Sequence, residues 1–146
     1  MDNHDHGMDE FQEKLEMYRS LEERLGAVMQ KQNVFSSKIV EIQGTIDSME
    51  SLSASDVLFP LGSAVYVKGS PEKEGKVVVE VGAGVALEKS ADQAKAILEK
   101  RKADIQKAVD TLANEARNIS SMMQSIEAEA QKMLKDREDK FKSVSS

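Results

Sequence analysis

The sequence predicts an α+β fold that is mostly α-helical, in which a short β insert joins two long helices of an antiparallel coiled coil. Two segments repeat apolar residues with heptad spacing, as coiled-coil helices do. The segment between them changes to the alternating, β-branched pattern of strands. With 32% charged residues, 4% aromatic residues and no Trp, the composition suits long exposed helices better than a compact core.

The first helix is predicted over residues 9–55, after a polar tail at residues 1–8. Its a and d positions are apolar except for Lys14 and Gln32, which indicates a coiled-coil seam. We interpret Gln32 as specifying register at some cost in stability; a stretch that flexes is the alternative. The a positions are Phe11, Tyr18, Leu25, Gln32, Ile39 and Ile46, and the d positions are Lys14, Leu21, Val28, Phe35, Ile42 and Met49.

The β insert is predicted over residues 56–89, where the apolar period is two. An apolar run at 57–61 opens it, and Pro60 limits that run to a sheet edge or a turn. The elements after this run are a strand at 64–68, a turn at 69–75, a strand at 76–81, a Gly-Ala-Gly break at 82–84 and a third strand at 85–88.

The insert is too small to be stable alone, because even domains of about 60 residues bury barely enough surface. Its strands also leave unpaired edges, which natural proteins pair, cover or charge. We therefore expect these strands to pair with strands of other chains, which makes the protein an oligomer. The residues predicted to pack in this assembly are Val65, Val67, Val77, Val79, Val81, Val85 and Leu87.

The second helix is predicted over residues 90–142, before a tail at 143–146. Ser90 and Gln93 form a capping-box pattern at its start. Its d positions are less apolar than its a positions, since Arg101 and Glu115 break the seam. Apolar e positions widen the stripe. The a positions are Ala91, Leu98, Ile105, Leu112, Ile119, Ile126 and Met133, and the apolar e positions are Val109, Ala116, Met123 and Ala130.

The second helix is expected to fold back on the first, because two helices of similar length flank the short insert. In that antiparallel register the numbers of facing residues sum to about 144. The predicted facing pairs are Ile46 with Leu98, Leu25 with Ile119, and Phe11 with Met133.

Charge and composition exclude several classes of protein. A net charge of −6 disfavours a nucleic-acid backbone as partner. The absence of Cys excludes disulfides and thiolate metal sites.

Neither a signal peptide nor an apolar run long enough for a bilayer is visible, which predicts a cytoplasmic protein without a membrane partner. No catalytic triad or P-loop occurs, so we expect no enzyme and no cofactor. His4 and His6, with Asp2 and Asp5, make a poor metal site because nothing orients them.

Two stretches of the insert resemble the base of archaeal prefoldin alpha subunits, and are similar to the eukaryotic alpha-class subunits. They are residues 58–69 (LFPLGSAVYVKG) and 79–88 (VEVGAGVALE), and a capped helix follows the second. The flanking coiled coils agree in length and placement, so the resemblance covers nearly the whole chain.

The resemblance implies a hexamer of two alpha and four beta subunits, with a central double β-barrel built from hairpins and six projecting coiled coils. It implies an ATP-independent chaperone that captures non-native polypeptides at the coiled-coil tips and delivers them to a group II chaperonin. Alpha subunits carry two hairpins, and Gly82-Ala83-Gly84 is expected to let the chain cross from the first to the second.

The tips of the coiled coil are the expected client-binding surface. Phe11 and Met133 are interpreted chiefly as the end of the seam, and the other apolar residues there as exposed for clients, since Met and splayed helix ends make adaptable surfaces. The candidate tip residues are Met8, Phe11, Leu15, Met17, Met133, Leu134, Phe141 and Val144.

Two other functions compete with the chaperone hypothesis. The first is a structural coiled-coil tether or adaptor that binds a folded partner and has no effect on denatured proteins. The second is a helical arm that binds nucleic acid. That arm requires a basic helix face, which the acidic balance of this sequence disfavours.

Overall fold

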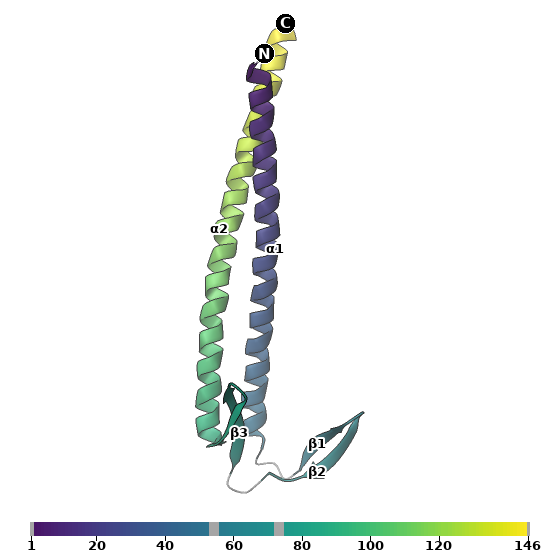
Figure 1. Cartoon of the computed structure of the whole chain (residues 1–146), viewed down its shortest axis with the longest axis vertical. Coiled ribbons are helices and arrows are strands. Elements are labelled where there is room, and N and C mark those ends of the chain that lie inside the picture. Colours follow the sequence, from purple (N-terminus) through teal and green to yellow (C-terminus); the bar gives the residue numbers. More distant parts are fainter. Residues whose placement is uncertain (1, 53–55, 72–74, 146) are drawn as a thin grey trace. The chain divides into compact units, whose positions relative to one another are not determined.

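A computed structural model describes residues 2–52, 56–71 and 75–145 of the chain. Two long helices flank two β-hairpins in the sequence (Figure 1), which confirms the predicted fold class. The elements are α1 (Asp2–Glu50), β1 (Val57–Gly62), β2 (Val65–Gly69), β3 (Lys76–Gly82), β4 (Val85–Ser90) and α2 (Ala91–Ser145). The chain divides into a hairpin unit, residues 35–108, and a terminal unit, residues 1–34 with 109–146.

The helices differ at their ends from the sequence prediction. α1 already begins at Asp2, inside the predicted polar tail, because residues 2–8 contain no proline and Gly7 costs a helix only about 1 kcal/mol. It ends at Glu50, where the amides of Ser51 and Leu52 bond to carbonyls three residues back and tighten the last turn. α2 continues to Ser145. Residues 53–55, assigned to the first helix from sequence, lie outside the described part.

In the hairpin unit, the two helices pack through a small apolar core. Ile42, Ile46 and Leu98 are buried together, and Met49 and Ile105 pack against them. Ile46 and Leu98 therefore share one cluster, as the predicted register requires.

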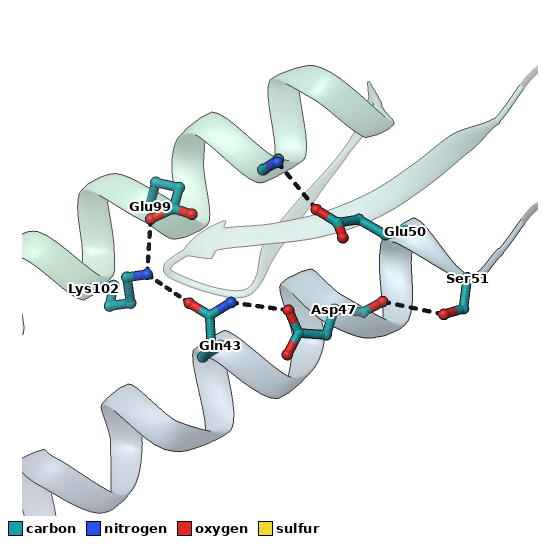
Figure 2. A network of polar contacts seen from close by, with 7 residues as sticks. Gln43, Asp47, Glu50, Ser51, Glu99 and Lys102 are labelled. Carbon is teal, nitrogen blue, oxygen red and sulfur yellow. Dashed lines mark hydrogen bonds and ion pairs between the residues drawn. The ribbon is translucent and has the colours of Figure 1, made fainter.

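Polar contacts beside this core have the same register. Lys102 Nζ lies 2.6 Å from Gln43 Oε1 and also pairs with Glu99 of its own helix (Figure 2). Lys95 Nζ lies 3.1 Å from Glu50 Oε1. Each interhelical pair differs by one residue from the pair that the predicted register gives. The register is thus observed in this unit to within one residue.

In the terminal unit, the seam of α2 moves from its d positions to its e positions. Val109, an e position, is buried, whereas the d positions Met122 and Glu129 are exposed. A helix with 3.6 residues per turn drifts by about 20° per heptad against a strict seven-residue repeat, which accounts for this change. The other buried apolar side chains of the unit are Val28, Leu112, Ile119 and Ile126.

Ion pairs join the helices on the flanks of this seam. Lys14 pairs with Glu129, and Arg24 Nη2 lies 3.3 Å from Glu115 Oε1. Glu115, which breaks the seam in the sequence, therefore has a cationic partner at the edge of the seam. These exposed pairs fix the alignment of the helices more than they stabilise them.

The β insert forms two separate antiparallel hairpins, β1 with β2 and β3 with β4. Gly82-Ala83-Gly84 lies inside the second hairpin, so the prediction that these residues carry the chain from one hairpin to the next was wrong. Ala83 and Gly84 have φ values of 51° and 75°, as the two-residue turns favoured by twisted hairpins require. The chain instead passes from the first hairpin to the second between Gly69, the end of β2, and Lys76, the start of β3.

The apolar run before the predicted strands is itself a strand, β1, and it includes Pro60. Pro60 is paired with Tyr66 of β2. Each sheet has only two strands among the described residues, so every strand is an edge strand, where proline is tolerated. The sheets therefore form no closed barrel within the described part of this chain.

Candidate functional site

The strands expose an unusually large amount of apolar surface. Large exposed apolar patches on soluble proteins mark interaction sites. A two-stranded hairpin is also only marginally stable in water without further packing. The exposed large apolar side chains of the strands are Leu58, Phe59, Leu61, Val65, Tyr66, Val67, Val78, Val81, Val85 and Leu87.

The residues predicted from sequence to pack between subunits fall into two groups. Val79 is buried, with 9% of its surface exposed, and Val77 is half-buried. These two belong to the packing of the chain itself. The outward-facing group consists of Val65, Val67, Val81, Val85 and Leu87.

Sequence reasoning missed part of the exposed surface. Leu58, Phe59 and Leu61 were not among the predicted assembly residues, and all three are exposed strand residues. The usable signal was the run itself, since an apolar segment beside a two-stranded sheet has no core to enter. Tyr66 and Val78 are exposed as well and were also missed.

The second hairpin is held against its own helix. The guanidinium of Arg101 in α2 donates a hydrogen bond to the backbone carbonyl of Glu80 in β3. Next to Glu80, the side chain of Val79 is buried. Arg101, a seam-breaking position in the sequence, therefore has a partner in the β insert.

The junction from β4 to α2 is closed by the predicted capping box. The Gln93 amide donates to the Ser90 hydroxyl oxygen at 3.1 Å, and the Ser90 amide donates to Gln93 Oε1 at 3.2 Å. Two amides at the helix start are thus satisfied reciprocally. The last strand and the second helix consequently join without a linker.

The first hairpin is packed mainly on itself. The ring of Phe59 lies over Gly69, where an added Cβ would stand 2.6 Å from Phe59 Cε2. Phe59 itself is 46% exposed. Gly69 therefore makes room for an aromatic ring that remains open to solvent on its other side.

The candidate client residues at the ends of the helices also divide into two groups. Phe11 and Met133 are half-buried, as residues that end the seam should be. Leu15 was predicted with the exposed group and is half-buried instead, because a heptad e position flanks the seam. The exposed residues are Met8, Met17, Leu134, Phe141 and Val144, and the last two are 76% and 86% exposed.

Met17 also lines a shallow groove in the terminal unit, which sequence reasoning did not foresee. The groove has a volume of about 510 Å³ and includes Leu21 and Ile126 of the seam. Met122 lies on its α2 side and is exposed because the seam of α2 has moved to the e positions. In the sequence, only the apolar e positions of the second helix pointed to this groove.

Two lysines that bridge the helices have perturbed acidity. The hydrogen bond to Glu129 raises the pKa of Lys14, and the hydrogen bond to Glu50 raises the pKa of Lys95. Both lysines are cations at neutral pH in any case. Their role here is to join the helices and not to transfer protons.

The described residues include no cluster of three or more His, Asp or Glu residues able to hold a metal ion. The side chains of Asp2, His4 and Asp5, considered above as a loose metal site, lie outside the described part. No helix in that part is both long enough and apolar enough to cross a membrane.

Comparison with known proteins gives one consistent result. The sequence model of the Prefoldin family, described as "Prefoldin subunit", matches residues 21–136. The prefoldin subunit alpha of Methanobrevibacter smithii is 22% identical over 130 residues, which cover 87% of this chain and 89% of that relative. The prefoldin subunit alpha of Nitrosopumilus maritimus is 28% identical over 123 residues, which cover 82% and 85%.

A solved structure shows the same fold. A chain in the cryo-EM structure of filamentous PFD from Methanocaldococcus jannaschii matches with a TM-score of 0.69 and 21% sequence identity. The match covers 78% of this chain and 98% of that chain.

Proposed function

The chain belongs to the prefoldin family, and on this premise we propose that it is an alpha-type subunit that assembles with other prefoldin subunits through its β-hairpins. Prefoldins are chaperones and not enzymes, so the chain is a chaperone subunit. The proposed partners are beta subunits, in a hexamer of two alpha and four beta chains located in the cytosol.

The exposed apolar surface of the hairpins carries the assembly part of this proposal. Ten strand residues that are Val, Leu, Phe or Tyr are open to solvent in a chain of low overall hydrophobicity. Covering such side chains contributes about 25 cal/mol per Å² of apolar area, which favours association strongly. The strands also have unpaired edges to which other strands can add.

The second part of the proposal concerns the client. The exposed apolar residues near the chain ends, chiefly Met17, Phe141 and Val144, bind apolar segments of non-native polypeptides without sequence preference. Each contact is weak, and several subunits acting together supply the affinity. The captured polypeptide then passes to a group II chaperonin, without ATP.

An aggregation assay with a matched control tests the client surface. The double variant Phe141→Ser with Val144→Ser, assembled with beta subunits, should suppress aggregation of a denatured protein several-fold less well than the unchanged complex. Val40→Ser is the control, because Val40 is also well exposed, at 72%, but lies in the hairpin unit. Equal activity of all three complexes, at unchanged mass, would remove these tip residues from the client site.

A further inference from the structure

We propose that the contact between Arg101 and the second hairpin is a latch of the unassembled chain, which opens when the chain assembles. Arg101 occupies an acceptor on the outer edge of β3 and releases it when a strand of another subunit arrives. The proposal rests on the proposed assembly of the hairpins into closed barrels. It adds to that assembly a contact within the free subunit that has to break first.

The first step is to establish which way the bonded carbonyl points. In a β-strand, the N–H and the C=O of one residue point to the same side, and the side alternates along the strand. The Ser90 amide bonds to the side chain of Gln93, so the pair of Ser90 with Lys76 has its backbone groups turned outward. Glu80 lies at an alternate position of the same strand as Lys76, so its carbonyl also points away from β4. The acceptor that Arg101 binds therefore belongs to the outer edge of β3.

An added strand cannot share this place with Arg101. Neighbouring strands of a sheet lie about 4.8 Å apart, so the backbone of an added strand would run through the space that the guanidinium fills. The N–H of that strand would also need the Glu80 carbonyl as its acceptor. A closed barrel leaves no strand edge unpaired. The contact of Arg101 with Glu80 must therefore open when the barrel closes.

Several features hold the latch closed in the isolated chain. Arg101 and the hairpin belong to the same unit of the chain, and the side chain of Arg101 is half-buried. Its hydrogen bond is charge-assisted and thus stronger than a neutral one. Val79, next to Glu80, is buried. The capping box of Ser90 and Gln93 joins β4 to α2 without a linker, which keeps the hairpin near the helix.

The same hairpin has a larger surface that favours opening. Val81, Val85 and Leu87 are exposed in the chain alone. Covering them on assembly is favourable in proportion to the apolar area that leaves water. The released guanidinium returns to solvent, so no charge is left buried without a partner. Assembly can therefore exchange the Arg101 contact for a paired strand.

The latch protects the subunit before it assembles. An unpaired strand edge is a template for pairing with unrelated chains, and long cationic side chains are one way in which proteins cover such edges. Arg101 covers the β3 edge in this manner until a partner strand replaces it. This role also accounts for a charged residue at a d position of the α2 seam.

Assembly kinetics with matched variants test the latch. The isolated chain is mixed with separately purified prefoldin beta subunits, and complex formation is followed by fluorescence energy transfer between labelled subunits. Arg101→Met removes the donor and keeps an unbranched side chain of similar length, so this variant should assemble several-fold faster. Lys100→Met removes the same charge from the adjacent, exposed residue and should assemble at the unchanged rate.

Two kinetic results would overturn the proposal. The first is an Arg101→Met chain that assembles no faster than the unchanged chain, because no contact would then have to break. The second is an equal acceleration by Lys100→Met, because net charge and not the latch would then control the rate.

Hydrogen exchange of the unchanged protein measures the opening itself. The Glu80 amide points to the same side as its carbonyl, so it should exchange at least about tenfold more slowly in the complex, where a strand replaces Arg101. An unchanged exchange rate of this amide in a fully assembled complex would contradict the opening of the latch. Failure of the unchanged chain to form any complex would instead refute the proposed function on which the latch rests.

Discussion

The two β-hairpins follow one backbone plan but have different surroundings. Each residue of the first corresponds to the residue twenty positions later in the second, so Gly62 matches Gly82 in register, bulge and positive φ. Yet Val79 of the second hairpin is buried and its neighbour is bonded to Arg101, whereas the corresponding Phe59 is 46% exposed. The second hairpin thus packs against its own helix, whereas the first, with the same backbone fold, leaves the corresponding side chain exposed.

This difference distinguishes what local sequence determines from what long-range contacts determine. Turn residues and β-branched residues determine the backbone of each hairpin, because they set the dihedral angles and the register. Long-range contacts determine which faces are covered. A chaperone subunit that must assemble benefits when one hairpin is positioned by its own helix while the exposed apolar residues of both hairpins remain available to partners.

The largest effect is expected from a charge at matched positions of the two hairpins. Val79→Asp buries a carboxylate that has no partner, which should cost about 3 kcal/mol or more and detach the second hairpin. Phe59→Asp places the same charge on an exposed surface and should leave the isolated chain nearly unchanged. In the isolated chain, hydrogen exchange of the β3 and β4 amides measures the effect of Val79→Asp, and exchange of the β1 and β2 amides measures the effect of Phe59→Asp. Similar exchange in the two variants would mean that the hairpins are equally free.

The next effect concerns the contact between Phe59 and Gly69. Gly69→Ala places a methyl group within 2.6 Å of the ring and should destabilise the first hairpin by about 1–3 kcal/mol. The corresponding residue of the second hairpin is Lys89, and Lys89→Ala should change stability by less than about 0.5 kcal/mol. Amide exchange in the complex gives the measurement, in β1 and β2 for Gly69→Ala and in β3 and β4 for Lys89→Ala.

A compensating substitution controls for other effects of Gly69→Ala. Phe59→Val copies Val79 and removes the ring that the new methyl group would meet. The double variant should therefore recover most of the exchange protection that Gly69→Ala loses. No recovery would show that the glycine is needed for its backbone and not for the ring.

A smaller effect is expected from exchanging the turn residues. Ala64 and Gly84 correspond, and both have positive φ, of 63° and 75°. Left-handed backbone costs a non-glycine residue about 1 kcal/mol, so Ala64→Gly should stabilise the first hairpin and Gly84→Ala should destabilise the second by about that amount. Denaturant titration of the assembled complex measures both changes. Changes of the same sign would contradict the equivalence of the two turns.

The smallest effect is expected at the helix ends from which the hairpins emerge. The hydrogen bond to Glu50 raises the pKa of Lys95 above its ordinary value of 10.5. A pKa raised by folding means that the pair contributes stability below the ordinary pKa and loses it as the pH rises through the raised value. NMR titration should show that Glu50→Gln lowers the pKa of Lys95 toward 10.5. The pKa of Lys14, which bonds to Glu129, should not change; if it does, the variant has altered more than one ion pair.

Much of the fold could be predicted from the sequence because it depends on periodicity. The heptads placed Ile46 beside Leu98, and the capping box placed the start of α2 correctly. The order of the hairpins could not be read in the same way. Gly82-Ala83-Gly84 looked like a break between hairpins, since a glycine-rich segment permits a turn or a crossing equally well and only pairing distinguishes them.

The candidate site was less predictable than the fold. Alternation identifies strand residues but does not say which face another element covers, so Val79 was grouped with residues that are exposed. The contact of Arg101 with Glu80 joins a helix to a strand edge through one side chain, and no local pattern encodes it. Pro60 left a sheet edge and a turn open for the run at 57–61, because proline is tolerated in both, and only the pairing with β2 distinguishes them.

Native mass spectrometry of the complex purified through a tag on this chain tests the central claim most directly. If the exposed hairpins are an assembly surface, the chain should be recovered in a hetero-oligomer with two copies of itself and four copies of a prefoldin beta subunit. Val79→Asp should lower the yield of that particle. A chain recovered only as a monomer, with its hairpins still formed, would contradict the account, because the apolar strands would then need no partner.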